Sequence, residues 1–407
     1  MWRLRKMKMK KLSSVILIAF VSIQLNAQTW TALTSGTTSS LVAVAVPSID
    51  TAYVVGVSGI ILKTINGGTT WTPQTSGTSN VLYQIAFIDN LKGFAVGDLG
   101  TVLKTINGGA TWTSLSISSA GSTHLCNVYF YNSMQGYIVG AGGLIIKTTD
   151  GGSTWAPLTI GTSQQINGVA FTSASTGYVS AFGGEIWKTT DGGTTWSPLT
   201  SGTTNALGQI RFTSAINGFI CGDAGTIIKT TDAGATWTTI PSGTTSDNLT
   251  GMDFLDPTHG FVMGGNSGAN IGSRIETTNS GATWTYTLPG TAFIERIAFF
   301  SPNLGYAAGF SGTILKYTNT LGIAENHLEN NMTIYPNPFD SQATILFDKE
   351  QKNIIVKIID VLGKQVRSIN FSGKELLIEK GDLLAGTYFV QITDEKKNFV
   401  SKTIIIK

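Results

Sequence analysis

A repeat of about 41 residues runs through the middle of the chain and constrains its fold more than any other feature. Seven tryptophans mark it at intervals of 41 to 47 residues: Trp30, Trp71, Trp112, Trp155, Trp196, Trp237 and Trp284. Each of the last six closes an octapeptide, such as T-I-N-G-G-T-T-W at Thr64–Trp71 or T-T-D-G-G-S-T-W at Thr148–Trp155. Such a period is typical of stacked units, because one unit alone cannot bury its apolar surface.

Each unit reads as four short strands separated by turns. An apolar strand and a G-F/Y-x-x-G segment come first, followed by a short strand such as Thr101–Thr105. Asn-Gly or Asp-Gly pairs before the last strand predict tight hairpin turns, because these turns need positive φ. Four strands in about 40 to 45 residues is the size of a propeller blade. A content of 42% hydrophobic and 13% charged residues excludes a disordered chain.

The number of blades follows from the third-strand segment. It occurs seven times, at Lys63, Lys104, Lys147, Lys188, Lys229, Glu276 and Lys316. The last copy lacks a following octapeptide, whereas the segment Gln28–Leu33 lacks preceding strands. We therefore predict a seven-bladed propeller over residues 28–320, in which the Trp30 strand completes the blade formed by Ile294 to Thr318. The alternative is an open array of six blades, which would leave strand edges exposed.

The octapeptide resembles the Asp-box of sialidases, sortilin-like receptors and photosystem II assembly/stability factors. The full unit is most similar to the last family, and this resemblance implies a propeller but no particular activity. We expect the Asp-box residues to be structural, because Asp and Asn side chains accept turn N–H groups and Trp covers the hairpin. Calcium binding is the alternative, although calcium takes about six to eight oxygens and each box offers one ligand. The structural residues are Asn66, Asn107, Asp150, Asp191, Asp232 and Asn279, with Trp71, Trp112, Trp155, Trp196, Trp237 and Trp284.

Polar residues of the innermost strands are the candidate binding residues, because these strands line the central funnel. Alignment of the repeats gives Gln84, Asn127, Tyr129, Gln209, Arg211, Asp253 and Arg296. Arg211 and Asp253 stand in register on adjacent blades, as either a salt bridge or a ligand-facing pair. Loop insertions within Asn266–Gly272 and Ser114–His124 are expected on the same face, which indicates ligand binding there, with sequence drift in tolerant loops as the alternative.

The sequence favours a binding module over an enzyme. A sialidase-like site would need the three propeller arginines, Arg211, Arg274 and Arg296, to gather beside carboxylates such as Asp253 and Glu295. No catalytic nucleophile motif and no metal-type Cys/His spacing occurs, so we predict no cofactor and no metal. We expect an unidentified protein or glycan ligand. A glycan hydrolase and a surface structural protein without a discrete ligand are the alternatives.

The first 27 residues are typical of a secretory signal peptide. Six basic residues precede the apolar run Leu12–Ile23, and the small residue Ala27 stands at the cleavage position. A retained anchor is the alternative, although the run is short for a membrane span. The chain's formal charge is +3, so the part without these six cations carries −3 and lacks a basic patch for nucleic acid. Cys126 and Cys221 fall in non-neighbouring units, so we expect two free, buried thiols.

A second module follows a polar linker at 321–330. Residues 331–407 contain Y-P-N-P at Tyr335–Pro338, D-x-x-G-K-x-V at Asp360–Val366 and L-x-x-G-x-Y-x-x-x-I at Leu383–Ile392. Alternating short strands predict a small β-sandwich. The three motifs resemble the type A C-terminal sorting domain of the type IX secretion system of Bacteroidota. This resemblance implies that the secretion machinery is a partner and that the mature chain, without a transmembrane span, reaches the outer-membrane surface or the medium. An ordinary adhesive sandwich is the alternative.

Overall fold

The computed structural model describes residues 27–320, 332–360, 365–393 and 399–407. Three parts of the chain lie outside these ranges: residues 1–26 of the expected signal peptide, the expected linker, and residues 361–364 of the D-x-x-G-K-x-V motif. The chain divides into two compact units, one covering Asn26–Asn319 and one containing Thr320–Lys407. Within the described ranges, no helix is long and apolar enough to cross a membrane.

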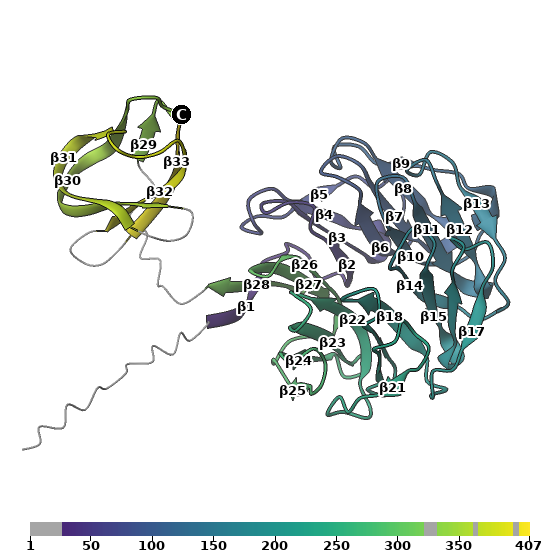
Figure 1. Cartoon of the computed structure of the whole chain (residues 1–407). Helices are drawn as coiled ribbons and strands as arrows, with labels where there is room; N and C mark the ends of the chain where they lie inside the picture. Colours follow the sequence, from purple (N-terminus) through teal and green to yellow (C-terminus); the bar gives the residue numbers. More distant parts are fainter. Residues whose placement is uncertain (1–26, 321–331, 361–364, 394–398) are drawn as a thin grey trace, which may run out of the picture. The chain divides into compact units, whose positions relative to one another are not determined.

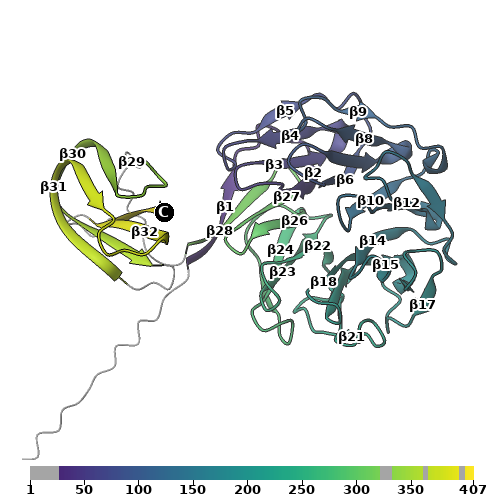
Figure 2. The ribbon, with the colours of Figure 1, turned by 45° about the horizontal axis from the view of Figure 1, so that its top comes forward.

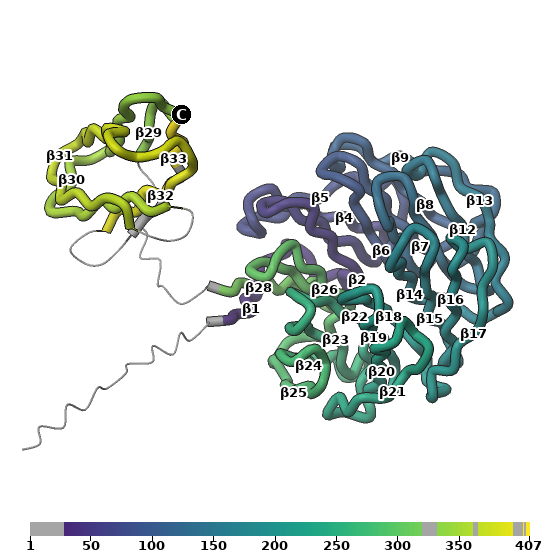
Figure 3. The backbone as a smooth tube through the Cα atoms, in the orientation of Figure 1, coloured from purple at the N-terminus to yellow at the C-terminus, as the bar shows by residue number. Residues whose placement is uncertain are grey.

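The first unit is a ring of seven four-stranded sheets, which confirms the predicted all-β propeller (Figures 1 and 2). We number the sheets as blades 1 to 7 in chain order. Blades 1 to 6 each take four consecutive strands, from β2–β5 in blade 1 to β22–β25 in blade 6. Blade 7 has the order β1-β28-β27-β26, so the N-terminal strand completes it as predicted. The tube in Figure 3 shows β1 beside β28, which closes the ring.

The four strand positions have similar bounds in every blade. The innermost strands are β2 (Leu41–Ala45), β6 (Leu82–Phe87), β10 (Leu125–Phe130), β14 (Ile166–Phe171), β18 (Leu207–Phe212), β22 (Asn248–Phe254) and β26 (Ile294–Ser301). The second strands are β3 (Ala52–Gly56), β7 (Gly93–Gly97), β11 (Gly136–Gly140), β15 (Gly177–Ala181), β19 (Gly218–Gly222), β23 (Gly260–Asn266) and β27 (Leu304–Gly309). The third strands are β4 (Ile61–Thr64), β8 (Val102–Thr105), β12 (Ile145–Thr148), β16 (Ile186–Thr189), β20 (Ile227–Thr230), β24 (Ile271–Thr277) and β28 (Ile314–Thr320). The outermost strands are β5 (Thr72–Gln74), β9 (Thr113–Ser114), β13 (Ala156–Leu158), β17 (Ser197–Leu199), β21 (Thr238–Thr239), β25 (Thr285–Thr287) and β1 (Ala27–Leu33).

Both faces of each blade are buried, which explains why the strands lack polar alternation. In β3, Val54 packs with Tyr306 of blade 7, whereas the next residue, Val55, packs with Ile85 of blade 2. Successive side chains of a strand point to opposite faces, so an uninterrupted apolar strand supplies two inter-blade cores at once. The low charge of the chain therefore follows from stacking.

The Asp-box forms a larger loop than the tight hairpin turn that its Asn-Gly or Asp-Gly pair predicts. In blade 4 the loop covers residues 190–196, between β16 and β17. Oγ1 of Thr189 accepts from the Gly193 N–H at 2.9 Å, and Oδ1 of Asp191 accepts from the Thr195 N–H at 2.9 Å. The box thus has its own hydrogen-bond network, and its side chains take the place of the backbone bonds of a two-residue turn.

Loops gather on two faces of the ring. On the first, which we call the mouth face, the loops between second and third strands contact the connectors between blades; the Val57 N–H donates to the Ser40 carbonyl at 3.1 Å. These loops contain η1 (Val57–Gly59), η2 (Asp98–Gly100), η4 (Ala141–Gly143) and η5 (Phe182–Gly184), whereas η3 (Ser118–Ala120) lies in a blade connector. On the opposite face, the box face, the Gly67 N–H of an Asp-box donates to the Asp50 carbonyl at 3.0 Å.

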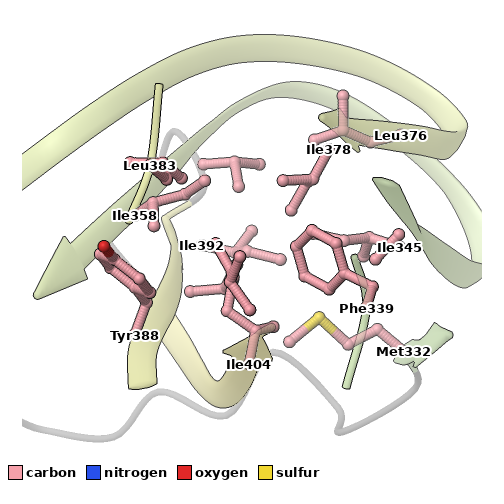
Figure 4. Packing of buried hydrophobic residues seen from close by; sticks show 14 of the residues in the cluster. Met332, Phe339, Ile345, Ile358, Leu376, Ile378, Leu383, Tyr388, Ile392 and Ile404 are labelled. Atoms are coloured by element: carbon pink, nitrogen blue, oxygen red, sulfur yellow. The ribbon is translucent and has the colours of Figure 1, made fainter. Parts of the chain in front are cut away.

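The second unit is also all-β. Its strands are β29 (Met332–Tyr335), β30 (Gln342–Asp360), β31 (Gln365–Glu379), β32 (Gly386–Thr393) and β33 (Phe399–Ile406). They join into one five-stranded sheet, because the long strand β30 pairs with β29, β31 and β32. Figure 4 shows how side chains from several of these strands meet in one core, including Ile345, Ile358 and Ile392. The strand β30 has 19 residues and is longer than the short strands that the sequence predicts.

Candidate functional site at the mouth of the propeller channel

Four of the sequence-predicted residues form hydrogen bonds between neighbouring blades along the wall of the channel. They occupy the third position of the innermost strands: Gln84, Asn127, Gln209 and Arg296. Nε2 of Gln84 lies 3.4 Å from Oδ1 of Asn127, and Nδ2 of Asn127 donates to the Asn167 carbonyl at 3.0 Å. Oε1 of Gln209 accepts from the Met252 N–H at 2.6 Å, and Nη1 of Arg296 donates to the Thr250 carbonyl at 2.6 Å. Most of their polar groups are therefore engaged within the ring.

The other three predicted residues also bridge blades. Nε of Arg211 lies 3.6 Å from Oδ1 of Asp253, so the salt-bridge alternative describes this pair. Oδ2 of Asp253 accepts from the Phe299 N–H at 2.8 Å. Burial raises the pKa of Asp253, and the guanidinium of Arg211 opposes that rise. The hydroxyl of Tyr129 lies 3.3 Å from the Phe171 carbonyl of the next blade.

The groups of a sialidase-like site are dispersed. Arg211 and Arg296 both line a cavity of 180 Å³ on the box-face side of the channel. Arg274 instead lines a different cavity, between blades 6 and 7. Glu295 lines the cavity at the mouth, while Asp253 pairs with Arg211 deeper in the ring. The structure thus separates Arg274 from the other two arginines that the hydrolase alternative would require beside it.

The mouth of the channel holds a cavity of 250 Å³ to which every blade contributes an innermost strand. Its lining includes Val42, Tyr83, Cys126, Asn167, Gly208, Thr250 and Glu295, which are the second residues of these strands or their equivalents. Loop and connector residues complete the rim: His124, Gln165, Phe182 and Asp223. This mixture of aromatic, amide and charged side chains is typical of a ligand pocket.

Two of the lining residues, Tyr83 and His124, form a cluster of interacting side chains with Asp98, which lies outside the lining. Nδ1 of His124 lies 2.6 Å from Oδ1 of Asp98, and the Tyr83 hydroxyl donates to Oδ2 of Asp98 at 3.3 Å. The rings of Tyr83 and His124 lie 4.3 Å apart. Because a carboxylate only accepts, the proton of neutral His124 resides on Nδ1, which leaves Nε2 as an acceptor. Burial, reinforced by Asp98, raises the pKa of Tyr83 to about 12.

Two carboxylates from other blades, Asp223 and Glu295, also line the cavity, and Glu295 is adjacent to Arg296 in β26. Burial raises the pKa of Glu295, and Arg296 opposes that rise. Burial also raises the pKa of Asp223. The Cys126 thiol is a poor nucleophile here, because burial raises its pKa to about 12. Both cysteines are free and buried, as predicted. The cavity therefore offers hydrogen-bonding and aromatic contacts together with acid groups.

Four residues that line or border the mouth were not predicted from the sequence: Tyr83, Asp98, His124 and Asp223. The register of each innermost strand shifts at this level, as between Leu82 and Gln84 of β6. Such a bulge adds one residue that breaks the alternation of a strand. The repeat alignment contained one usable signal: Tyr83 and Glu295 stand at second positions that other blades fill with uncharged, non-aromatic residues.

Two family models match the chain. The "Photosynthesis system II assembly factor YCF48" model matches residues 74–164 and 154–245. The "Secretion system C-terminal sorting domain" model matches residues 333–407. The chain is an Asp-box propeller similar to the photosystem II assembly factors, followed by a secretion system sorting domain. The sorting domain indicates export to the cell surface or the medium, and it implies contact with the secretion machinery.

Solved structures share the propeller fold. A YCF48 bound to D1 peptide is 20% identical, with a TM-score of 0.61 over 72% of this chain and 95% of that chain. YCF48 from Cyanidioschyzon merolae is 19% identical, with a TM-score of 0.59 over 71% and 98%. The GH74 enzyme of Niastella koreensis is 14% identical, with a TM-score of 0.59 over 93% and 74%. At these identities the likeness concerns the fold alone.

A curated relative shares only part of its length with the chain. An endo-acting ulvan lyase of Formosa agariphila is 34% identical over 90 residues, which are 22% of this chain. The chain spans 17% of the length of that lyase. A match over so short a segment does not extend the activity of the lyase to this chain.

Proposed function

We propose that this chain is an exported, non-catalytic binding module that takes a protein or glycan ligand at the mouth of its channel. The observation that carries the proposal is the mouth cavity, whose lining comes from all seven blades while the deeper polar residues are engaged between blades. A volume of 250 Å³ suits one side chain or one sugar ring of a larger ligand. The peptide-bound photosystem II assembly factor supports peptide recognition by a similar ring.

The proposal includes a route of export. Residues 1–27 direct the chain through the inner membrane as a cleaved signal peptide, and residues 331–407 then engage the type IX secretion machinery. The propeller is either anchored at the outer-membrane surface or released. Fractionation of a type IX-competent host that expresses the full chain, or the chain without residues 331–407, tests this route. Equal surface and medium levels of both forms would contradict it.

A glycan and surface-protein array screened with the full chain tests the binding function. Tyr83→Ser and His124→Ala should each weaken a detected interaction about tenfold, because the aromatic and imidazole contacts of the mouth are lost. The matched control is Ile65→Ser on the box face, where Ile65 is 69% exposed. An unchanged affinity in both mouth variants would overturn the site. A silent array with folded protein would favour the surface structural alternative.

A glycan hydrolase is the second candidate, because Asp223 and Glu295 line one cavity and burial raises the pKa of both carboxyl groups. Paired carboxyl groups supply the acid and base of most glycosidases. The test is release of reducing ends from bacterial and algal polysaccharides by the parent chain and by Glu295→Gln. Turnover by the parent that Glu295→Gln abolishes would support the enzyme and contradict a non-catalytic module.

A further inference from the structure

Arg274 occupies a position of the third strand that holds an aliphatic residue in every other blade. The equivalent residues of the third strands are Ile61, Val102, Ile145, Ile186, Ile227 and Ile314. All six are fully buried, with 0% exposure, in the cores between blades. The other six blades therefore serve as internal comparisons. They show that this position normally holds an aliphatic side chain, which in blade 6 is replaced by a guanidinium group. A cation in such a place is unfavourable unless it has a charged or hydrogen-bonding partner.

Arg274 lines a cavity of 210 Å³ between blades 6 and 7. Met263 and Ser273 come from blade 6, Ile294 and Leu315 from blade 7, and Trp30 from the closing strand β1. Pro289 and Thr291 of the blade connector complete the lining. The cavity shares none of these residues with the two channel cavities, so it is a separate site.

Four polar atoms of this lining are buried without a hydrogen-bond partner among the described residues. They are Nε1 of Trp30, Oγ of Ser273, Nε of Arg274 and Oγ1 of Thr291. Ser273 itself is 1% exposed. None of the lining residues is acidic. Glu276, two residues along β24 from Arg274, lies outside the lining, and its Oε1 lies 2.8 Å from Nε2 of His259. The cavity thus combines one permanent cation and two hydroxyl groups with no compensating anion of its own.

We propose that this cavity is a binding site for a short monocarboxylate with an apolar tail. A guanidinium edge pairs with the two oxygens of a carboxylate, and the hydroxyls of Ser273 and Thr291 can donate to the same oxygens. Met263, Pro289, Ile294 and Leu315 form an apolar wall for the tail. One arginine matches a single negative charge, whereas a dianionic phosphate would remain uncompensated in a half-apolar cavity.

The competing explanation is that Arg274 only compensates for an irregular interface between blades 6 and 7. Each other third strand carries a lysine that donates to the Asp-box of the next blade, as from Nζ of Lys229 to the Ser280 carbonyl at 2.7 Å. Blade 7 has no Asp-box, and blade 6 carries Glu276 instead of this lysine. If Arg274 were only part of this irregular interface, it would have no ligand.

Ligand-observed NMR on the full chain, with benzoate and butyrate as probes and benzyl alcohol as the neutral control, decides between the two explanations. We expect saturable binding of the carboxylates and at least a tenfold weaker response to benzyl alcohol. Arg274→Ile should keep the fold, since isoleucine occupies this position in other blades, and should weaken carboxylate binding at least tenfold. Arg211→Gln, which removes a guanidinium from the channel, should leave that binding unchanged.

A second variant keeps the test decisive if Arg274→Ile perturbs the fold. Ser273→Ala combined with Thr291→Val removes both hydroxyls and preserves the cation, and it should weaken benzoate binding about threefold to tenfold. Benzoate that binds no better than benzyl alcohol to the parent chain would overturn the site. Equal binding by the parent and both sets of variants would overturn it as well. Neither outcome bears on the mouth cavity, because Tyr83→Ser reports on that site independently.

Discussion

Nζ of Lys316 donates to the carbonyl of Gly67 at 2.7 Å, which joins the last blade to the Asp-box of the first. The same contact recurs inside the ring, as from Lys63 to Gly108 at 2.6 Å and from Lys147 to Gly192 at 2.8 Å. Each of these lysines also lies over an aromatic ring of its own blade; Lys316 is 6.0 Å from the ring of Tyr306. The closing interface therefore uses the same chemistry as the interfaces between consecutive blades.

Replacement of this closing lysine should destabilise the ring. Lys316→Met keeps the apolar stem and removes the charged donor, so we expect the free energy of unfolding to fall by about 1–2 kcal/mol. Urea denaturation of the full chain measures the change. Lys147→Met is the matched control at an interior interface and should have a similar effect. If Lys316→Met left the free energy of unfolding unchanged while Lys147→Met lowered it, closure of the ring would not depend on this bond.

The Asp-boxes predict an acid-sensitive component of stability. Oδ2 of Asp191 accepts from the Thr195 hydroxyl at 2.7 Å, and its Oδ1 accepts from the Thr195 N–H at 2.9 Å. The Thr195 hydroxyl is the main reason that the pKa of Asp191 falls to about 2, and Thr236 has the same effect on Asp232. Hydrogen bonds from the Thr154 hydroxyl and N–H likewise lower the pKa of Asp150.

A folded-state pKa below the unfolded value means that the unfolded chain binds more protons between those two values. The stabilisation is complete above about pH 4, where the unfolded carboxyl is ionised, and it is lost as the pH falls towards 2. Replacement of Asp150, Asp191 and Asp232 together by Asn should therefore flatten the fall in stability between pH 4 and 2. At pH 7 the variant should fold, because Asn66, Asn107 and Asn279 form the same loop. Thermal unfolding at both pH values measures this, and an equally steep acid dependence in the variant would contradict it.

Sequence reasoning located the blades and their closure because each depends on patterns that repeat. Trp30 without preceding strands and Lys316 without a following box were enough to predict a composite blade. The candidate site was harder to predict, because the bulge at residues such as Tyr83 changes which side chains face the mouth. Alternation pointed to Gln84 and Gln209, and these hydrogen-bond to neighbouring blades instead. Asp98 was out of reach because its pairing with His124 joins two blades through loops.

The Arg211–Asp253 pair should stabilise the ring modestly. The two side chains are 31% and 22% exposed, so solvent screens part of their attraction, and we expect a coupling energy of about 1 kcal/mol in a double-mutant cycle. Arg211→Leu alone should lower the free energy of unfolding by about 2 kcal/mol at pH 7, because Asp253 then keeps its charge at a half-buried position without its partner. This deficit should shrink as the pH falls through the raised pKa of Asp253, since protonation removes the unpaired charge. A deficit that is constant from pH 7 to pH 4 would show that packing, not charge, dominates.

Leu99 holds a strained backbone conformation at the mouth, with φ of 53° and ψ of 38°. The equivalent residues of blades 3 and 4 are Gly142 and Gly183, and a leucine in this left-handed region is destabilised by about 1–2 kcal/mol. Leu99→Gly should therefore raise the free energy of unfolding by about 0.5–1 kcal/mol, after the larger backbone entropy of glycine in the unfolded chain is subtracted. Gly142→Leu is the reciprocal control. An added Cβ at Gly142 meets no atom within 4 Å, so its expected loss of about 1 kcal/mol would report conformation rather than a clash.

The same variant tests why the strain persists. Leu99 is 65% exposed and follows Asp98, the partner of His124. Residues in strained backbone conformations often cluster at binding sites. If Leu99 contacts the ligand, Leu99→Gly should raise stability and weaken ligand binding severalfold, measured by urea denaturation and by titration with a ligand from the array. A gain in stability with unchanged affinity would place Leu99 outside the binding surface. The contact region would then be restricted to the mouth cavity with Tyr83 and His124.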